Sequence, residues 1–387
     1  MALTNVYYSP SGAGSQDGSS AANAKAAITG TSWTTDIEGE TRQNTRWIFL
    51  AGTYTVTEEL APTSTDPNAD NPHFWVGADA SGNLLEPKWS DDSQSHLDTT
   101  DYPKIIRTNN GTIFDAAGTS TVYKCLYLEN TSTGYNQGGV LNSTFSESLR
   151  NFLHGCFLKF GANASASNNN ARVHSNFGGK CVMCEFVAGG TKFDNIIQNG
   201  GTHYSTVINC RLYGSGTSGS GNGNGIKCDT ISPIIVNCVI DNLHGNGIAD
   251  LSTSEGRNGT FFSNTITRMG GNGIDSDAAA QTQGGVLVEN NIIYDVGGFA
   301  VTANANDDDR LLGSQIGIGD ATSGNFQNLD EYENLFTVTA VATTDFVDYA
   351  NQDYRIRRDS ALYKKTEAGN LNLGAIQNED FEFVSVS

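Results

Sequence analysis

The chain has 387 residues, with 22 Lys and Arg against 42 Asp and Glu, and a formal net charge of −20. This acidic excess argues against binding nucleic acid or an anionic membrane through the general surface. Hydrophobic residues make up 37% and charged residues 17%, and 44 glycines accompany many Asn, Ser and Thr, a composition typical of a turn-rich all-β protein. The sequence has no apolar run of about 18 residues and no recognisable export signal at its start, so neither a bilayer span nor a signal peptide is expected.

In chain order, residues 1–45 are expected to cap the first coil of a solenoid, with a short helix near residues 21–28. Residues 46–305 should form the solenoid itself. Within it, residues 60–100 read as a loop insertion rich in Asp, Pro, Ser and Asn. Residues 306–387, beginning with an acidic stretch, should close the C-terminal end, because an uncapped solenoid would expose its strand edges.

The solenoid is predicted from a repeat in which short alternating segments return at a nearly constant spacing. The segments begin at Cys156, Cys184, Cys210, Cys238, Asn264 and Asn291, which are 28, 26, 28, 26 and 27 residues apart by subtraction, and Cys125 lies 31 residues before the first. Apolar and polar residues alternate within them, as in a strand with one buried face. The four cysteines and two asparagines should therefore form an interior ladder along the stack.

Two further strands accompany each of these segments, one before it and one containing a repeated Asn-Gly-Ile. Three short strands per coil of about 27 residues predict a three-sided solenoid whose coils stack about 4.8 Å apart. Asn209, Asn237 and Asn290 precede the ladder positions and fit a turn with left-handed backbone.

Residues 100–305 resemble the pectate-lyase-like superfamily of right-handed parallel β-helices. The opening Tyr-Tyr-Ser-Pro-Ser-Gly at residues 7–12, the Phe-Leu-Ala-Gly-Thr-Tyr at 49–54 and the closing segment from Asp353 to Ile376 are similar to the corresponding parts of such proteins. The resemblance implies an all-β, single-stranded right-handed parallel β-helix with N- and C-terminal caps. It leaves the function open, because the superfamily includes lyases, hydrolases, epimerases, adhesins and phage tailspikes.

The candidate catalytic residues are carboxylates that follow the Asn-Gly-Ile segments of successive coils. A lyase of this superfamily would need such a cluster for calcium and a basic residue to remove a proton. The carboxylates are Asp229, Asp250, Asp275 and Asp277, and the neighbouring bases are Lys227, His244, Arg257 and Arg268. The alternative is a row of solvated turn aspartates, and we expect no calcium-dependent lyase activity.

Three other groups of residues are of the types that form binding or metal sites. Asp307, Asp308 and Asp309 could hold calcium, but they lack the spacing of an EF-hand loop, so we expect neither a metal nor a cofactor. Aromatic rings in or beside loops could stack on sugars: Trp75, Trp89, Tyr135 and Tyr204. The seven cysteines are odd in number and lie in the middle of the chain, which favours buried free thiols over a disulfide framework.

The first functional hypothesis is a phage structural protein on the virion surface, either a tailspike-like appendage or a head decoration. Such a protein is made in the reducing host cytoplasm and can keep its thiols free. Its expected partners are further copies of itself (a trimer is favoured), other virion proteins and host cell-surface polysaccharide. The alternatives are a polysaccharide lyase or glycoside hydrolase, which would be secreted, and a bacterial surface adhesin.

Overall fold

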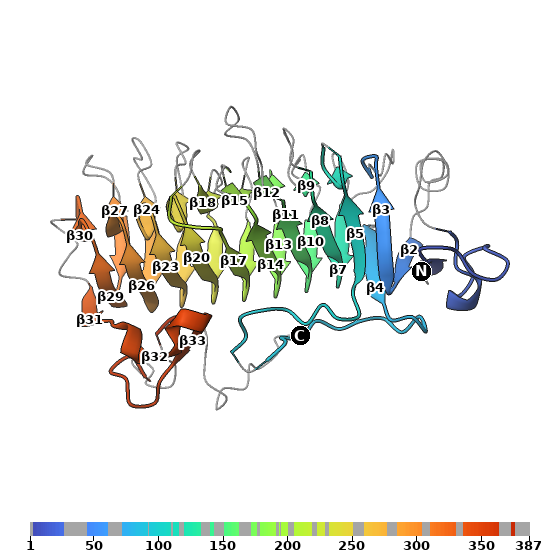
Figure 1. The fold of residues 1–387 in the computed structure, drawn as a ribbon. Helices are drawn as coiled ribbons and strands as arrows, with labels where there is room; N and C mark the ends of the chain where they lie inside the picture. Colours follow the sequence, from blue (N-terminus) through green and yellow to red (C-terminus); the bar gives the residue numbers. More distant parts are fainter. Residues whose placement is uncertain are drawn as a thin grey trace.

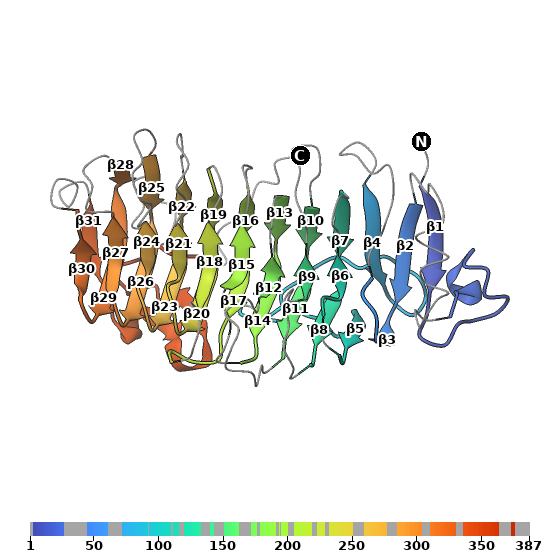
Figure 2. The ribbon, with the colours of Figure 1, turned by 90° about the horizontal axis from the view of Figure 1, so that it is seen from above.

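The computed structural model is a parallel β-helix built from three long sheets, and the residues that it describes contain almost no helix (Figures 1 and 2). The structure describes residues 3–26, 45–60, 72–91, 93–109, 111–115, 120–132, 140–142, 151–161, 172–175, 179–190, 193, 195–199, 205–218, 223–228, 232–250, 259–276, 285–303, 310–329, 336–363 and 373–375.

Each coil contributes one strand to each sheet, and neighbouring strands within a sheet are parallel. The first sheet contains β1 (Thr4–Tyr8), β2 (Thr45–Leu50), β4 (His73–Ala78), β7 (Thr121–Lys124), β10 (Asn151–His154), β13 (Gly179–Val182), β16 (Thr206–Ile208), β19 (Ile234–Val236), β22 (Thr260–Phe262), β25 (Gly285–Glu289) and β28 (Arg310–Gly313). The second contains β3 (Gly52–Val56), β5 (Pro103–Arg107), β8 (Tyr127–Asn130), β11 (Phe157–Phe160), β14 (Glu185–Ala188), β17 (Arg211–Tyr213), β20 (Val239–Leu243), β23 (Thr265–Met269), β26 (Asn291–Val296), β29 (Gln315–Ala321) and β31 (Thr337–Ala340). The third contains β6 (Phe114–Asp115), β9 (Leu141–Asn142), β12 (Arg172–Ser175), β15 (Asn195–Asn199), β18 (Asn224–Cys228), β21 (Ile248–Asp250), β24 (Ile274–Ser276), β27 (Phe299–Ala303) and β30 (Gly324–Gln327).

The predicted fold class is confirmed: the chain is a right-handed parallel β-helix with three sides. Its limits differ from the expected ones. β1 already pairs with β2, so the stack begins inside the expected cap, and β28 to β31 extend it well past residue 305. The expected insertion also contains β4, a strand with the apolar run Phe-Trp-Val. The Asp- and Pro-rich residues around it hid this strand from the sequence analysis. The expected helix near residue 21 is a single 3₁₀ turn, η1 (Ala21–Asn23).

The core lies inside the stack, where each strand points alternate side chains. In the first sheet the inward row runs from Trp47 and Trp75 through Tyr123 to Leu153 and continues in register to Val288. All of these side chains are essentially buried. Parallel pairing in register stacks equivalent side chains of successive coils on one another, so each coil buries its apolar face against its neighbours.

The residues of the expected ladder lie at the same turn of successive coils. Cys156, Cys184, Cys210 and Cys238 occupy equivalent, fully buried positions at the turn between the first and second sheets. The Cys156 N–H donates to the Cys184 sulfur at 3.4 Å, and the Cys184 N–H donates to the Cys210 sulfur at the same distance.

After Cys238 the ladder continues with asparagines, whose side-chain oxygens are stronger hydrogen-bond acceptors than sulfur. The Cys238 N–H donates to Asn264 Oδ1 and the Asn264 N–H donates to Asn291 Oδ1, each at 2.9 Å. Asn264 Nδ2 also donates to Asn291 Oδ1 at 3.0 Å. The ladder therefore satisfies backbone donors at a turn that would otherwise bury them unpaired.

The residue before each ladder position has the expected left-handed backbone. The φ angles of Asn209, Asn237 and Asn290 are 52°, 56° and 56°. Cys125, with φ 52°, occupies this turn position and not the ladder, which begins at Leu126. The alignment of Cys125 with the ladder was therefore wrong by one residue.

Two segments cover the outer face of the second sheet. Residues 79–102, which connect β4 to β5, run along the stack, and in Figure 1 they pass below its middle coils. The C-terminal segment contains η3 (Thr343–Asp345), β32 (Phe346–Asp348), η4 (Tyr349–Asn351) and β33 (Asp353–Ile356). The two segments meet where Ser95 Oγ donates to the Gln352 carbonyl at 2.7 Å.

Candidate functional site

The candidate carboxylates belong to the third sheet. Its outward row aligns Lys227, Ala249, Asp275 and Thr302 on successive coils. Asp275 accepts a hydrogen bond from Asn246 Nδ2 at 2.7 Å and another from Thr302 Oγ1 at 2.5 Å. The carboxylate therefore ties together side chains from three coils. Lys227 lies two coils away in the same row, about 10 Å along the axis.

The other candidates near this row are only partly placed. Asp250 ends β21 opposite Cys228, and Asp229 and Asp277 lie outside the described residues. Among the described residues, no three His, Cys, Asp or Glu side chains gather closely enough to hold a metal ion. Of the neighbouring bases, Arg268 points from the second sheet and pairs with Asp241, so it does not belong to this row.

The candidate acidic loop at Asp307, Asp308 and Asp309 also lies outside the described residues. Asp320, the next acidic residue along the chain, is exposed on β29 and accepts a hydrogen bond from the Tyr294 hydroxyl at 3.2 Å. None of the helices that the structure describes is long and apolar enough to cross a membrane.

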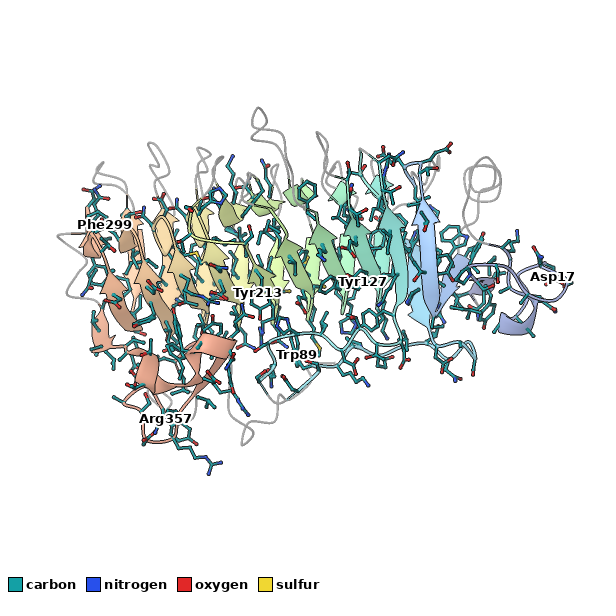
Figure 3. The ribbon with its side chains drawn as sticks, viewed as in Figure 1. Asp17, Trp89, Tyr127, Tyr213, Phe299 and Arg357 are labelled. Atoms are coloured by element: carbon teal, nitrogen blue, oxygen red, sulfur yellow. The ribbon has the colours of Figure 1, made fainter. Side chains whose placement is uncertain are left out.

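The candidate sugar-stacking aromatic residues differ in location and burial. Trp75 was expected in a loop but lies in the core of β4 with 0% exposure, packed against Trp47 and Phe114, and it cannot offer its face to a ligand. Tyr135 and Tyr204 lie outside the described residues. Trp89 lies in the covering segment (Figure 3) and is half-buried, with its ring over the Arg211 guanidinium at 4.5 Å from the centroid.

Arg211 is the buried cation that fixes Trp89. Its Nε donates to the Gln94 carbonyl at 2.7 Å, and its Nη1 donates to the carbonyls of Cys210 and Asn237 at 3.0 and 3.3 Å. The side chain has no solvent exposure, and burial lowers the pKa of the guanidinium from its usual range. Carbonyl oxygens thus solvate the cation where water is excluded.

A buried carboxylate beside Arg211 anchors the same segment. Glu185 accepts from the Leu97 N–H at 2.8 Å and contacts His96 Nδ1 at 2.8 Å. The hydrogen bond to Glu185 is the main cause that raises the pKa of His96, while burial opposes it. The Tyr213 hydroxyl donates to the Ser95 carbonyl, which holds the tip of the segment on β17.

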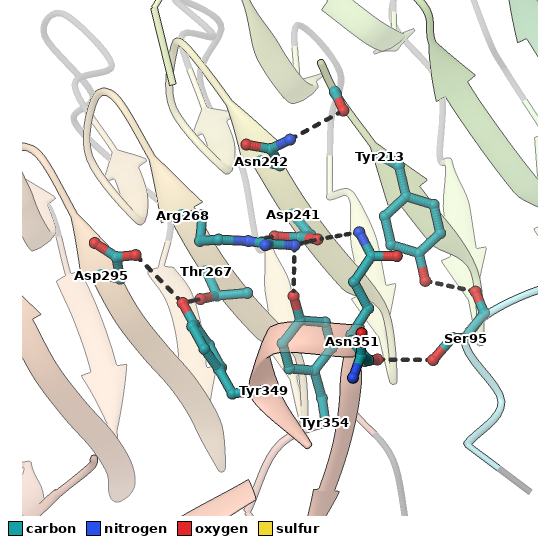
Figure 4. Close-up of polar contacts among 12 residues, drawn as sticks. Ser95, Tyr213, Asp241, Asn242, Thr267, Arg268, Asp295, Tyr349, Asn351 and Tyr354 are labelled. Carbon is teal, nitrogen blue, oxygen red and sulfur yellow. Dashed lines mark hydrogen bonds and ion pairs between the residues drawn. The ribbon is translucent and has the colours of Figure 1, made fainter. Parts of the chain in front are cut away.

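A second polar cluster holds the C-terminal segment (Figure 4). The Arg268 guanidinium donates to both carboxylate oxygens of Asp241, which is fully buried, and to the Tyr354 hydroxyl at 3.0 Å. Gln352 Nε2 donates to Asp241 Oδ2 at 3.1 Å. Burial raises the pKa of Asp241, and Arg268 pulls it back towards its ordinary value.

Sequence reasoning missed both clusters. Glu185, Arg211 and Asp241 occupy outward positions of strands, where polar residues normally meet solvent. Their burial comes from segments about 90 residues earlier and 110 residues later in the chain, as the Glu185–Leu97 and Asp241–Gln352 bonds show. The short-range repeat of the sequence cannot predict contacts between residues so far apart in the chain.

No family model and no curated protein matches the sequence. Among solved structures, the fold is similar to the crystal structure of pectate lyase Pel9A, with a TM-score of 0.54 and 14% identity, over 98% of this chain and 97% of that one. At this identity the likeness concerns the fold.

Proposed function

We propose that this β-helix is a structural protein of a phage virion surface, either a tailspike-like appendage or a head decoration, that contacts host polysaccharide without cleaving it. The observation that carries the structural role is the bonding of Asp275. Both of its carboxylate oxygens accept hydrogen bonds from neighbouring coils, so its described contacts serve the stacking of the third sheet. A catalytic carboxylate would instead be directed at a substrate.

The thiols support assembly in a reducing compartment. All seven cysteines are buried thiols that form no disulfide, and four of them stack in the ladder. A virion protein folds in the host cytoplasm, where thiols stay reduced, and only later meets an oxidising exterior. Burial raises the pKa of the Cys184 and Cys238 thiols, which protects them from oxidation at that stage.

Polysaccharide is proposed as the ligand class on two grounds. The fold is similar to that of a protein named as a pectate lyase, and an extended stack suits an extended chain of sugars. Trp89 supplies a half-buried aromatic ring whose orientation is fixed by Arg211. Sugar rings stack on such surfaces at little conformational cost.

An enzyme is the second candidate, and one alignment favours it. Lys227 and Asp275 share an outward row, separated only by the small side chain of Ala249. A base and a carboxylate on one face of a β-helix are the parts a polysaccharide lyase requires. The neighbouring genes would separate the candidates: capsid and tail genes favour the virion protein, and a sugar-uptake cluster favours the enzyme.

Glycan binding can be tested on an array of bacterial surface and plant polysaccharides with fluorescently labelled protein. We expect binding to at least one acidic or neutral polysaccharide, lost in Trp89→Ala and retained in Trp89→Phe, which keeps an aromatic face. Circular dichroism of both variants would control for folding. Binding to none of the polysaccharides, or equal binding by the folded Trp89→Ala variant, would contradict the proposed contact.

A further inference from the structure

The three outer faces of the stack differ in chemistry. The third sheet presents polar side chains such as the half-buried Lys227 and Asp275. The second sheet is covered by the chain's own segments, which bury Arg211 and Asp241 completely. The first sheet is different from both, because its outward side chains are largely apolar and, from β7 to β22, none of them is buried.

These outward side chains form two parallel rows, called here the outer strip. The strip consists of Val122, Lys124, Phe152, His154, Lys180, Val182, Thr206, Ile208, Ile234, Val236, Thr260 and Phe262. Seven of the twelve are Val, Ile or Phe, and Ile234 is 37% exposed. A continuous row of large apolar side chains on an open sheet face is unusual for a surface that meets only water.

At the first coils the chain covers the same face itself. Ile48 and Val76 continue the Lys124 row of the strip towards the N-terminus, and they are buried together with Ala24 and Tyr7 of the N-terminal segment. Beyond them, residues 79–102 border the strip through the Lys124–Glu86 ion pair at 2.6 Å. In the described part of the chain, no segment buries the strip between β7 and β22.

The charge of the strip indicates what covers it. The chain carries 20 more acidic than basic charges, yet none of the twelve positions is acidic, and Lys124 and Lys180 are basic, the first of them paired with Glu86. Two copies of so acidic a protein repel each other over most of their surface. The strip carries no carboxylates, so a second copy can approach this face with less repulsion. Since the rows repeat at each coil, about 4.8 Å apart, a copy lying alongside meets matching rows.

We propose that copies of the chain associate side by side through the outer strip of the first sheet. The contact uses interdigitating Val, Ile and Phe side chains at its centre, with basic residues at its border facing the acidic surface of the other copy. Twelve residues are fewer than the roughly 20–30 per side of a standard interface, so flanking turns must contribute and the association is reversible. Raising the salt concentration should strengthen it, because salt screens the mutual repulsion while apolar contact persists.

Light scattering coupled to size exclusion, over a range of concentrations and salt, tests the proposal. Wild-type protein should reach a mass of two or three chains of 41.1 kDa, and Ile234→Glu should remain a single chain. Val347→Glu is the matched control, since Val347 is 49% exposed but lies in the C-terminal segment, and it should assemble like wild type. Circular dichroism would establish that both variants are folded.

Three results would overturn the proposal. One is a wild-type mass of one chain at every concentration and salt, in which case the strip belongs to a different occupant. A second is equal assembly of wild type and folded Ile234→Glu, which would place the interface elsewhere. Loss of assembly in Val347→Glu together with Ile234→Glu would also count against it, because any added charge would then suffice.

Discussion

Replacing Arg268 by methionine should release the C-terminal segment from the second sheet. The substitution keeps the length of the side chain but removes the cation that pairs with Asp241, which has no solvent exposure. Gln352 and Tyr354 would remain as neutral donors. Removing one partner of a buried pair costs about 3–5 kcal/mol, because the other charge is left uncompensated.

The loss should appear as local opening. Because only residues near the cluster depend on the pair, β32 and β33 should exchange their amide hydrogens roughly two to four orders of magnitude faster, up to the limit of unprotected exchange. Hydrogen-exchange mass spectrometry would measure this directly. Peptides from the stack, such as those covering β10 and β13, should exchange at the wild-type rate.

The pH dependence of this loss has a definite sign. Burial raises the pKa of Asp241 in the folded protein, and removing Arg268 should raise it further. Stabilisation from a group with a raised folded pKa is present at low pH and is lost as the pH rises through that pKa. The deficit of Arg268→Met should therefore be greatest at neutral pH and shrink under mildly acidic conditions, where Asp241 becomes neutral.

The double variant Asp241→Asn with Arg268→Met provides the control. It removes both charges and leaves an amide that can still bond Gln352, so it should protect β32 and β33 better than the single variant does. Wild-type protection in Arg268→Met at neutral pH would refute the reasoning. So would equal losses in the single and double variants, because the uncompensated carboxylate would then not be the cause.

Three further predictions follow from the ladder and the covering segment. Asn264→Leu should lower the free energy of unfolding by about 1–3 kcal/mol in urea titrations, because the buried Cys238 N–H loses its acceptor, whereas Asn264→Cys should cost less; equal effects would contradict the ladder. Alkylation of denatured, unreduced protein should label seven cysteines by mass spectrometry; six blocked thiols would mean three disulfides. Because Glu185 raises the pKa of His96, their contact stabilises the covering segment below the ordinary His pKa and weakens as the pH rises through the raised value. Proteolysis between Lys88 and Asp98 should accelerate over that interval in wild type and lose this dependence in His96→Gln; identical pH profiles would count against the mechanism.

The stack could be predicted from the sequence because its determinants are local and repeated. The spacing of Cys156 to Asn291 and the left-handed asparagines follow from one turn used in every coil. At Cys125 the turn residue is itself a cysteine, so the spacing pattern placed the start of the ladder one residue too early. β4 was missed because its short apolar run does not alternate and is surrounded by Asp- and Pro-rich sequence.

The covered face could not be predicted, because burial there is imposed by distant chain segments. Arg211 lies in a short strand, and no neighbouring residue in the sequence indicates that the Trp89 ring packs over its guanidinium. The position after Asn-Gly-Ile correctly predicts that Asp275 lies on the outward row. It does not predict the hydrogen bonds of Asp275 with Asn246 and Thr302. Those bonds depend on the stagger between coils, which the sequence alone does not specify.

The structural role of the third sheet is tested most directly by incubating the protein with polygalacturonate, alginate and hyaluronan, with and without calcium, while following the absorbance of unsaturated uronates. We predict no rise with any substrate. A calcium-dependent rise that is abolished by Asp275→Ala and retained by Asp17→Ala, an exposed aspartate of the N-terminal segment, would contradict the proposal and identify the protein as a lyase.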